Sequence, residues 1–215
     1  MTGNNTDKDM KYDISEDVVS TGNPNELSIR FAVEKDIPLI LGFIKSLAEY
    51  ERMLEDVIAT EEILMESLFK RKAAEVVIAE YDGMPAGFAL FFHNFSTFLG
   101  KPGIYLEDLF VKPEFRGKGI GRRLLSFLAG LVLERGCGRL EWSCLDWNEP
   151  SIKFYKQLGA VPMQDWTVYR VIGAELADLA DCPYGLWTLP DNIDRCSYRE
   201  RDEKNTRCIH KKSTY

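Results

Sequence analysis

The sequence predicts an α+β fold, in which helices flank a central, mostly antiparallel mixed sheet. Apolar residues alternate over 76–81 and 85–95, on either side of Asp82-Gly83, a dipeptide typical of a β-hairpin turn. Apolar residues also recur at helical spacing before and after that hairpin. Finally, a helix connects the strands expected at 104–111 and 139–145, and such a crossover makes the two strands parallel.

The expected elements follow the order strand, helix, helix, three strands, helix, strand, helix and strand. Leu27–Val33 alternates like a first strand. Asp36 supplies an N-cap for an amphipathic helix to about Glu51, and Thr60 caps a second helix to about Lys72. After the hairpin come a strand at Ile104–Val111, a helix at Gly119–Arg135, a strand at Arg139–Leu145, a helix at Asn148–Leu158, a closing strand at Thr167–Ile172 and a short helix at Gly173–Ala180.

Composition predicts one folded domain between two tails. Of the 215 residues 45% are hydrophobic, which is ample for one core. Residues 1–26 are acidic with little core-forming pattern and predict a flexible arm, whereas residues 181–215 lose periodicity and predict an irregular tail. The domain is therefore expected at residues 27–180.

Charge and cysteine usage limit the possible partners and the compartment. The formal net charge of −7 argues against a general nucleic-acid binder and fits a cationic small substrate better. No apolar run approaches the length of a membrane span, and the polar amino terminus does not predict a leader. Five cysteines without a C-x-x-C pair indicate a reducing compartment, so we expect a cytoplasmic protein with no membrane association.

A glycine-rich segment directly after an acid-tipped strand is the strongest sequence signal. A helix N-terminus carries partial positive charge and free N–H groups, and alternating glycines let the oxygens of an anion approach them. Flanking cations favour a polyvalent anion such as a phosphate chain. The segment comprises Arg116, Gly117, Lys118, Gly119, Ile120, Gly121 and Arg122. A tight turn that binds no ligand is the structural alternative.

Other anion and metal motifs fit this chain poorly. The glycine spacing is G-x-G-x-G instead of the G-x-G-x-x-G of a dinucleotide site, and Gly119 stands where a Walker A loop follows its lysine with Ser or Thr. A zinc site would have to use the widely spaced Cys182, Cys196, Cys208 and His210, which do not have metal-like spacing. We expect no metal.

A second group of polar residues lies at the helix expected from Asn148. Asn148 can cap this helix, and Ser151 and Tyr155 follow at i+3 and i+7, so all three lie on one helical face. A tyrosine that served only for packing would rarely need both polar companions. The pattern favours a binding face that presents a phenol.

With these motifs, the chain resembles the GNAT superfamily of acyl-CoA-dependent N-acetyltransferases, most closely the spermidine/spermine (diamine) and thialysine group. The resemblance covers about residues 28 to 178. The segments that carry it are Leu47-Ala48-Glu49-Tyr50-Glu51, Tyr105-Leu106-Glu107-Asp108-Leu109-Phe110-Val111, Arg116-Gly117-Lys118-Gly119-Ile120-Gly121, Trp147-Asn148-Glu149-Pro150-Ser151, Phe154-Tyr155-Lys156 and Leu158-Gly159-Ala160.

The resemblance implies a role for each matching residue. Acetyl-CoA would be the co-substrate, with its pyrophosphate on Gly117–Arg122 beside Arg116. The backbone of Leu109, Phe110 and Val111 would hold the acetyl and pantetheine chain as an added strand would, and Asn148 and Ser151 would contact the coenzyme near its thiol. Glu107 would remove the proton of the amine, and Tyr155 would protonate the departing thiolate. Substrate-binding positions would be Tyr50, Glu51, Ser96, Asp108 and Trp166.

The resemblance leaves the amine substrate open. The polyamine enzymes have an aspartate where this chain has Ser96-Thr97, the pair of the thialysine-type relatives, and losing that carboxylate removes a site for the far end of a long polycation. A lysine-like amine or short diamine is therefore favoured over spermine. The alternatives are an acyl-CoA-binding sensor and a protein-amine acetyltransferase. The family is usually homodimeric, and the segment after Trp166 is a candidate for exchange between subunits.

Overall fold

A five-stranded sheet in the order β1-β2-β3-β4-β5 forms the centre of residues 26–143. The computed structural model describes residues 26–180, and residues 144–180 form a separate unit. The strands are β1 Leu27–Phe31, β2 Glu75–Tyr81, β3 Met84–Ser96, β4 Lys101–Val111 and β5 Leu140–Trp142. The helices are α1 Ile37–Tyr50, α2 Glu61–Leu64, α3 Ile120–Glu134, α4 Glu149–Gln157 and α5 Gly173–Ala180, with α4 and α5 in the second unit.

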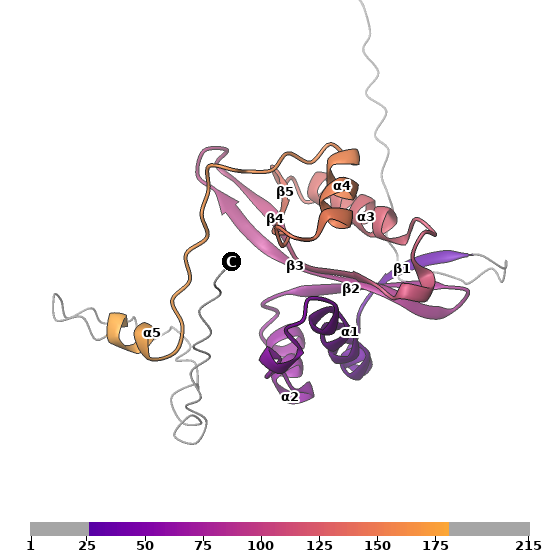
Figure 1. Cartoon of the computed structure of the whole chain (residues 1–215), viewed down its shortest axis with the longest axis horizontal. Helices are drawn as coiled ribbons and strands as arrows, with labels where there is room; N and C mark the ends of the chain where they lie inside the picture. The colour runs from indigo at the N-terminus through magenta and orange to yellow at the C-terminus, as the bar shows by residue number, and fades with distance from the viewer. Residues whose placement is uncertain (1–25, 181–215) are drawn as a thin grey trace, which may run out of the picture. The chain divides into compact units, whose positions relative to one another are not determined.

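Helices cover both faces of the sheet, with α1 and α2 on one face and α3 on the other (Figure 1). The first four strands pair antiparallel, and β5 pairs parallel to β4, to which α3 connects it. The predicted α+β fold class and the predicted crossover are therefore confirmed. None of the helices in the described residues is long and apolar enough to cross a membrane.

The predicted hairpin between β2 and β3 forms at Asp82-Gly83. Both residues have positive φ, 53° at Asp82 and 72° at Gly83, as a two-residue type I′ turn requires. This turn matches the right-handed twist of the two strands and starts the long strand β3. Strand β3 then pairs with β4 along most of its length.

Aromatic stacking fixes α1 against the sheet. The ring of Phe43 on α1 stacks on Phe88 of β3, with centroids 5.1 Å apart and planes 4° apart, and meets Phe110 of β4 edge-on at 6.3 Å. Phe43 and Phe88 are fully buried. Burying a side chain of this size stabilises the fold by about 1.5–3 kcal/mol. The C-terminal end of α1 is thereby held beside the C-terminal half of β4.

Asp36 precedes α1, but its carboxylate does not cap that helix as predicted. Instead it accepts the backbone N–H of Val33 at 2.8 Å and pairs with both terminal nitrogens of Arg30, at 2.6 and 3.0 Å. The Arg30 guanidinium lowers the pKa of Asp36. Arg30 also donates to Glu80 on β2, so the three residues join β1, β2 and the start of α1.

Several predicted boundaries change in the structure. Thr60 caps α2 as predicted and accepts the N–H of Ile63 at 3.3 Å, but the helix continues as a π-helix over Met65–Lys70. The prediction of a strand at Thr167–Ile172 is wrong for the single chain that the structure describes. These residues are irregular and exposed, with Tyr169 90% exposed. A strand needs a neighbour for its backbone N–H and C=O groups, and residues 167–172 have none in the described part of the chain.

Candidate active site

A one-residue bulge at Glu107 sets the geometry of β4. Leu106 pairs with Phe91 of β3, and Asp108 pairs with the adjacent Leu90, so Glu107 has no partner in the register. Adjacent residues of β3 face opposite sides of the sheet. The extra residue shifts the pairing of β4 with β3 by one position, so Leu106 and Asp108 face opposite sides instead of the same side. Leu106 therefore faces the α3 side, and Asp108 faces α1 together with Leu90 and Phe110.

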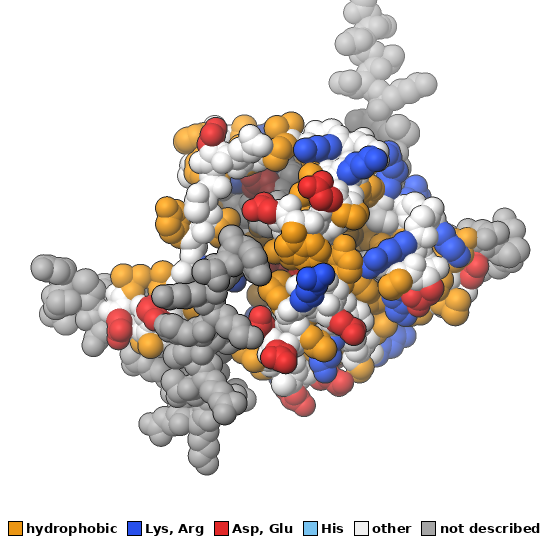
Figure 2. Space-filling view, viewed as in Figure 1, with side chains coloured by type: hydrophobic (Ala, Val, Ile, Leu, Met, Phe, Trp, Pro, Cys, Tyr) orange, Lys and Arg blue, Asp and Glu red, His pale blue; other side chains and the backbone are white. Residues whose placement is uncertain are grey.

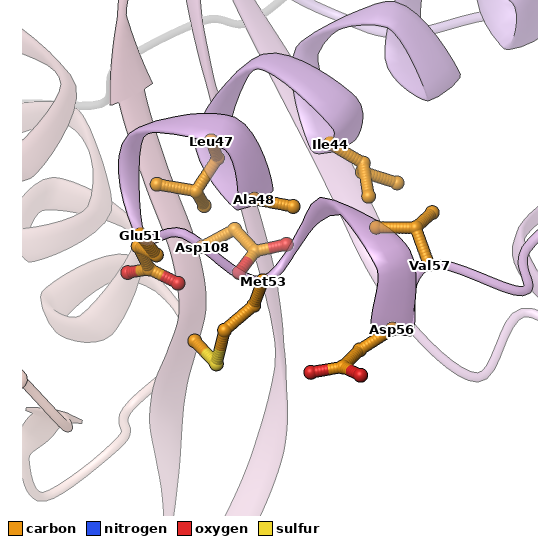
Figure 3. A pocket seen from close by; sticks show the side chains of 8 residues that line it. All are labelled: Ile44, Leu47, Ala48, Glu51, Met53, Asp56, Val57 and Asp108. Atoms are coloured by element: carbon orange, nitrogen blue, oxygen red, sulfur yellow. The ribbon is translucent and has the colours of Figure 1, made fainter. Parts of the chain in front are cut away.

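Asp108 reaches a pocket of about 210 Å³ beneath the end of α1 (Figure 3). Five apolar side chains and three carboxylates line it. The carboxylates come from three elements: Glu51 follows α1, Asp56 ends the short 3₁₀ turn Leu54–Asp56, and Asp108 lies on β4. The apolar lining residues are Ile44, Leu47, Ala48, Met53 and Val57.

The pocket holds unbalanced negative charge. Burial is the main cause that raises the pKa of Asp108 to about 6, and the nearby carboxylates of Glu107 and Glu51 raise it further. Burial also raises the pKa of Glu51. Within residues 26–180 no Lys, Arg or His forms an ion pair with Glu51, Asp56 or Asp108. Apolar walls with unpaired carboxylates suit an alkylammonium ion, which has methylene groups to bury and a charge to neutralise.

Glu107 itself is exposed at the bulge, so the two predicted acids have different surroundings. Asp108 is the acid that lines the pocket, together with the predicted residue Glu51. Tyr50 is the last residue of α1, and its ring faces the Arg116 guanidinium at 5.0 Å. Sequence reasoning missed Asp56 and Met53, which follow the helix and have no spacing pattern that would place them in the pocket.

The outer edge of β4 is open beyond the bulge. Within the described residues, β5 pairs with β4 only at Ile104–Leu106, whereas Leu109, Phe110 and Val111 pair with β3 alone. The β3 side is tightly packed: a Cβ added to Gly87 would lie 2.6 Å from the carbonyl oxygen of Phe110. Backbone groups on the open edge suit an extended ligand chain laid alongside the strand.

The glycine loop continues from this edge into α3. Gly117 and Gly119 both have φ of 78°, and Gly119 is the N-cap residue of α3. A Cβ at either position would meet no atom within 4 Å, so positive φ, and not packing, is the constraint that favours glycine. The start of α3, where the sequence predicts a phosphate group, is therefore unobstructed beside these two glycines.

The cations of the loop differ in their contacts. Lys and Arg side chains gather on the surface that carries the start of α3 (Figure 2). Lys118 lies over the ring of Tyr81, 4.1 Å from its centroid, and Arg122 is exposed on the first turn of α3. The side chain of Ile120 is buried in the core, so only its backbone is available to a ligand.

The remaining predicted site residues in the second unit belong to α4 and the segment after it. Asn148 is the N-cap of α4, and its side-chain oxygen accepts the N–H of Ser151 at 3.4 Å. Tyr155 is half-buried on the same helix, with its ring 5.4 Å from that of Phe154. Trp166 is 72% exposed.

Ser96 lies apart from the Asp108 pocket. It ends β3, six positions along that strand from Leu90, which corresponds to about 20 Å of extended chain. Its hydroxyl accepts the N–H of Leu99 at 3.3 Å and so stabilises the turn between β3 and β4. In the described chain, Ser96 is therefore a turn residue that does not line the pocket.

No group of three or more His, Cys, Asp or Glu residues within 26–180 has an arrangement that could hold a metal ion. The Cys182, Cys196, Cys208 and His210 set, for which the sequence did not favour zinc, lies outside the described residues.

Comparison with known proteins gives consistent matches. The family model described as "Acetyltransferase (GNAT) family" matches residues 42–160. The thialysine N-epsilon-acetyltransferase of Bos taurus is 36% identical over 164 residues, which cover 71% of this chain and 96% of that protein. The L-ornithine N5-acetyltransferase NATA1 of Arabidopsis thaliana is 31% identical over 202 residues, covering 73% of this chain and 89% of that protein.

A similar solved structure is the integron cassette protein VCH_CASS6 from the mobile metagenome of V. cholerae. Its TM-score is 0.62 at 28% identity, and the match covers 73% of this chain and 98% of that chain. The similarity extends over most of both chains.

Replacing Asp108 by Asn should stabilise the folded protein at neutral pH. In the folded protein the pKa of Asp108 is raised to about 6, above the ordinary value near 3.9. Stability therefore decreases as pH rises through this interval, because the folded state binds the proton more tightly. Asn removes this cost, which is up to about 3 kcal/mol at pH 7 and less than about 0.5 kcal/mol at pH 4. Urea unfolding of both proteins at the two pH values measures the difference.

Glu107→Gln is the matched control, because Glu107 is the adjacent but exposed acid. At pH 4 its free energy of unfolding should stay within about 0.5 kcal/mol of the wild type. At pH 7 its gain should be well below that of Asp108→Asn, because it removes the Glu107 contribution to the Asp108 pKa and leaves the larger contribution of burial. An Asp108→Asn protein that is no more stable than wild type at pH 7 would contradict the assignment of Asp108 as a half-buried carboxylate without an ion-pair partner in the described chain.

Proposed function

The chain belongs to the acetyltransferase (GNAT) family, and from this premise we propose that it transfers the acetyl group of acetyl-CoA directly to a primary amine of a small cationic substrate. The observation that carries the substrate class is the pocket, where Glu51, Asp56 and Asp108 have no ion-pair partner in the described chain and apolar side chains form the walls. The family assignment confirms the resemblance that the sequence motifs indicated.

The preferred amine is a lysine-like amino acid, such as thialysine or ornithine, or a short diamine; a long polyamine is a poorer substrate. Two similar proteins, the thialysine N-epsilon-acetyltransferase and the L-ornithine N5-acetyltransferase, are named for such amines and support this choice. The Ser96-Thr97 pair also supports it through the sequence resemblance, because the polyamine enzymes have an aspartate there. This support comes from sequence alone, since Ser96 does not line the pocket.

The chain offers a consistent set of groups to acetyl-CoA, which supplies an activated acyl group as a thioester. The glycine loop Gly117–Arg122 binds the pyrophosphate through backbone N–H groups at the start of α3. The open edge of β4 at Leu109, Phe110 and Val111 binds the pantetheine and acetyl chain. Asn148 and Ser151 of the second unit contact the coenzyme near its sulfur.

The two neighbouring acids take different parts in the reaction. An alkylamine with a pKa near 10.4 is protonated at neutral pH and must lose a proton before its nitrogen can attack. Asp108, ionised above its pKa of about 6, holds the ammonium group in the pocket. Glu107, exposed at the bulge, accepts the proton and passes it to solvent.

Tyr155 completes the proton balance, because the second proton that the amine nitrogen loses as the amide forms restores the Tyr155 phenol through solvent. As the amine nitrogen bonds to the acyl carbon, the carbon–sulfur bond breaks and leaves a thiolate. The Tyr155 phenol donates its proton to this sulfur, which is feasible because a phenol near pKa 10 and a thiol near 8.5 differ little. The substrate positions Tyr50, Glu51 and Trp166 and the coenzyme position Arg116 keep their family roles in this proposal.

A homodimer in the cytoplasm is the proposed form of the protein. In the described second unit, large apolar side chains are exposed along the segment from 161 to 179, which a second copy would cover. They are Val161, Met163, Trp166, Val168, Tyr169, Val171, Ile172, Leu176 and Leu179. The five cysteines without a C-x-x-C pair support the cytoplasmic location.

A substrate panel tests the proposed function. Purified protein with acetyl-CoA should release free thiol when given thialysine, L-lysine, L-ornithine or putrescine, and kcat/KM for the best of these should exceed that for spermine. Lysine-containing peptides should give no release above background. Release with peptides alone would favour a protein-amine acetyltransferase, and coenzyme binding without release on any amine would favour an acyl-CoA sensor.

Tyr155→Phe tests the proposed acid. Loss of the phenolic proton should lower kcat by about 10²- to 10⁴-fold, the usual contribution of a positioned acid, whereas the Kd of acetyl-CoA stays close to the wild-type value. Steady-state kinetics and calorimetric titration measure the two quantities. A kcat equal to that of the wild type would remove Tyr155 from the mechanism.

A further inference from the structure

Arg116 contacts aromatic side chains of two elements. Its guanidinium carbon lies 5.0 Å from the ring centroid of Tyr50 and 5.9 Å from that of Phe110, both within the range of a cation–π contact. Its Nε donates to the carbonyl oxygen of Val111 at 3.1 Å. The first cation of the glycine loop is therefore directed toward the sheet and the end of α1.

The two aromatic partners do not line the Asp108 pocket themselves, but each lies close in the chain to a residue that does. Tyr50 is the last residue of α1 and directly precedes the pocket residue Glu51. Phe110 lies two positions beyond Asp108 on β4 and packs against Phe43 of α1. Arg116 thus connects the end of α1, which Glu51 follows, with β4, which carries Asp108. It does so from the loop that leads into Gly117 and Gly119.

The geometry points to Arg116 as a positioning residue that couples the coenzyme loop to the amine pocket through Tyr50. This inference rests on the proposed function and adds a link between its two binding sites. When the phosphate groups fix the loop at Gly117 and Gly119, Arg116 holds Tyr50 and the end of α1 against β4, and the carboxylates of the pocket keep their spacing. Coenzyme binding therefore raises the affinity for the amine, and by thermodynamic reciprocity the amine raises the affinity for the coenzyme.

The neighbouring Lys118 provides a contrast within the same loop. It also lies over aromatic rings, those of Tyr81 at 4.1 Å and Phe115 at 5.5 Å, but these belong to β2 and to the 3₁₀ turn Pro113–Phe115. Neither ring belongs to α1 or β4, the two elements next to the pocket acids Glu51 and Asp108. Removal of Lys118 should therefore weaken coenzyme binding without breaking the link to the amine.

The test measures the ratio of the Kd of L-ornithine without and with saturating coenzyme A, by calorimetric titration. Coenzyme A forms a complex with no acetyl group to transfer, so this ratio does not depend on turnover. In the wild type the ratio should be at least about tenfold, the lower end of the combined size of two exposed cation–π contacts and one hydrogen bond. In Arg116→Met and in Tyr50→Leu it should fall to about one, and the double variant should show no further loss.

Three further variants distinguish positioning from simple phosphate binding. Tyr50→Phe keeps the ring and should keep the wild-type ratio. Arg116→Lys keeps the positive charge but loses the planar contact with two rings, so coenzyme affinity should persist while the ratio falls. Lys118→Met should raise the Kd of coenzyme A and keep the ratio. Thermal unfolding of each variant checks that the fold is intact.

The inference is overturned if the ratio of the two L-ornithine Kd values is one in the wild type, or if Arg116→Met keeps the wild-type ratio. It is also overturned if Arg116→Met and Tyr50→Leu each lower the ratio and their effects multiply in the double variant. Turnover of L-ornithine by the wild type together with any of these results would overturn the coupling alone. Absence of both turnover and binding for every amine of the panel would overturn the proposed function and the coupling with it.

Discussion

The bulge at Glu107 is the constraint on which both halves of the site depend. One extra residue in β4 turns Asp108 from the α3 side of the sheet to the α1 side. The same residue marks the place where pairing between β4 and β5 ends, so Leu109–Val111 have an open edge. A regular strand would direct the Asp108 carboxylate toward the apolar core under α3. The bulge thus places Asp108 in the pocket on one face and leaves a free strand edge beside it, which are the positions proposed for the amine and the coenzyme chain.

The surrounding core holds this arrangement against its electrostatic cost. Burial of Asp108 near the carboxylates of Glu107 and Glu51, without an ion-pair partner among residues 26–180, raises its pKa. The stacked rings of Phe43 and Phe88 and the close approach of Gly87 to Phe110 fix α1, β3 and β4 around them. Replacing such an unpaired carboxylate by a neutral residue would stabilise the fold. A carboxylate that is present despite this cost is typical of a binding site.

Features that depend on a few neighbouring residues could be predicted from the sequence, whereas features that depend on distant parts of the chain could not. The type I′ turn at Asp82-Gly83 and the glycine loop before α3 follow from backbone preferences of a few residues, so the sequence predicted them directly. The pocket residues Met53 and Asp56 depend on how the chain leaves α1, and the bulge depends on the partner strand, neither of which any spacing encodes. Thr167–Ile172 shows the reverse: its alternation is that of a strand, but a strand also needs a partner, which the described chain does not provide.

In the proposed function the half-buried carboxylate of Asp108 receives the amine, and the titration of this carboxylate tests that role most directly. The pKa of Asp108 can be measured from the pH dependence of its carbon-13 carboxyl shift, assigned by comparison with Asp108→Asn, with and without L-ornithine in the presence of coenzyme A. A pKa of about 6 in the free protein is expected, because burial and neighbouring carboxylates raise it, and it should fall when the ammonium group enters the pocket. A pKa near 4 in the free protein, or one that the amine leaves unchanged, would contradict the account.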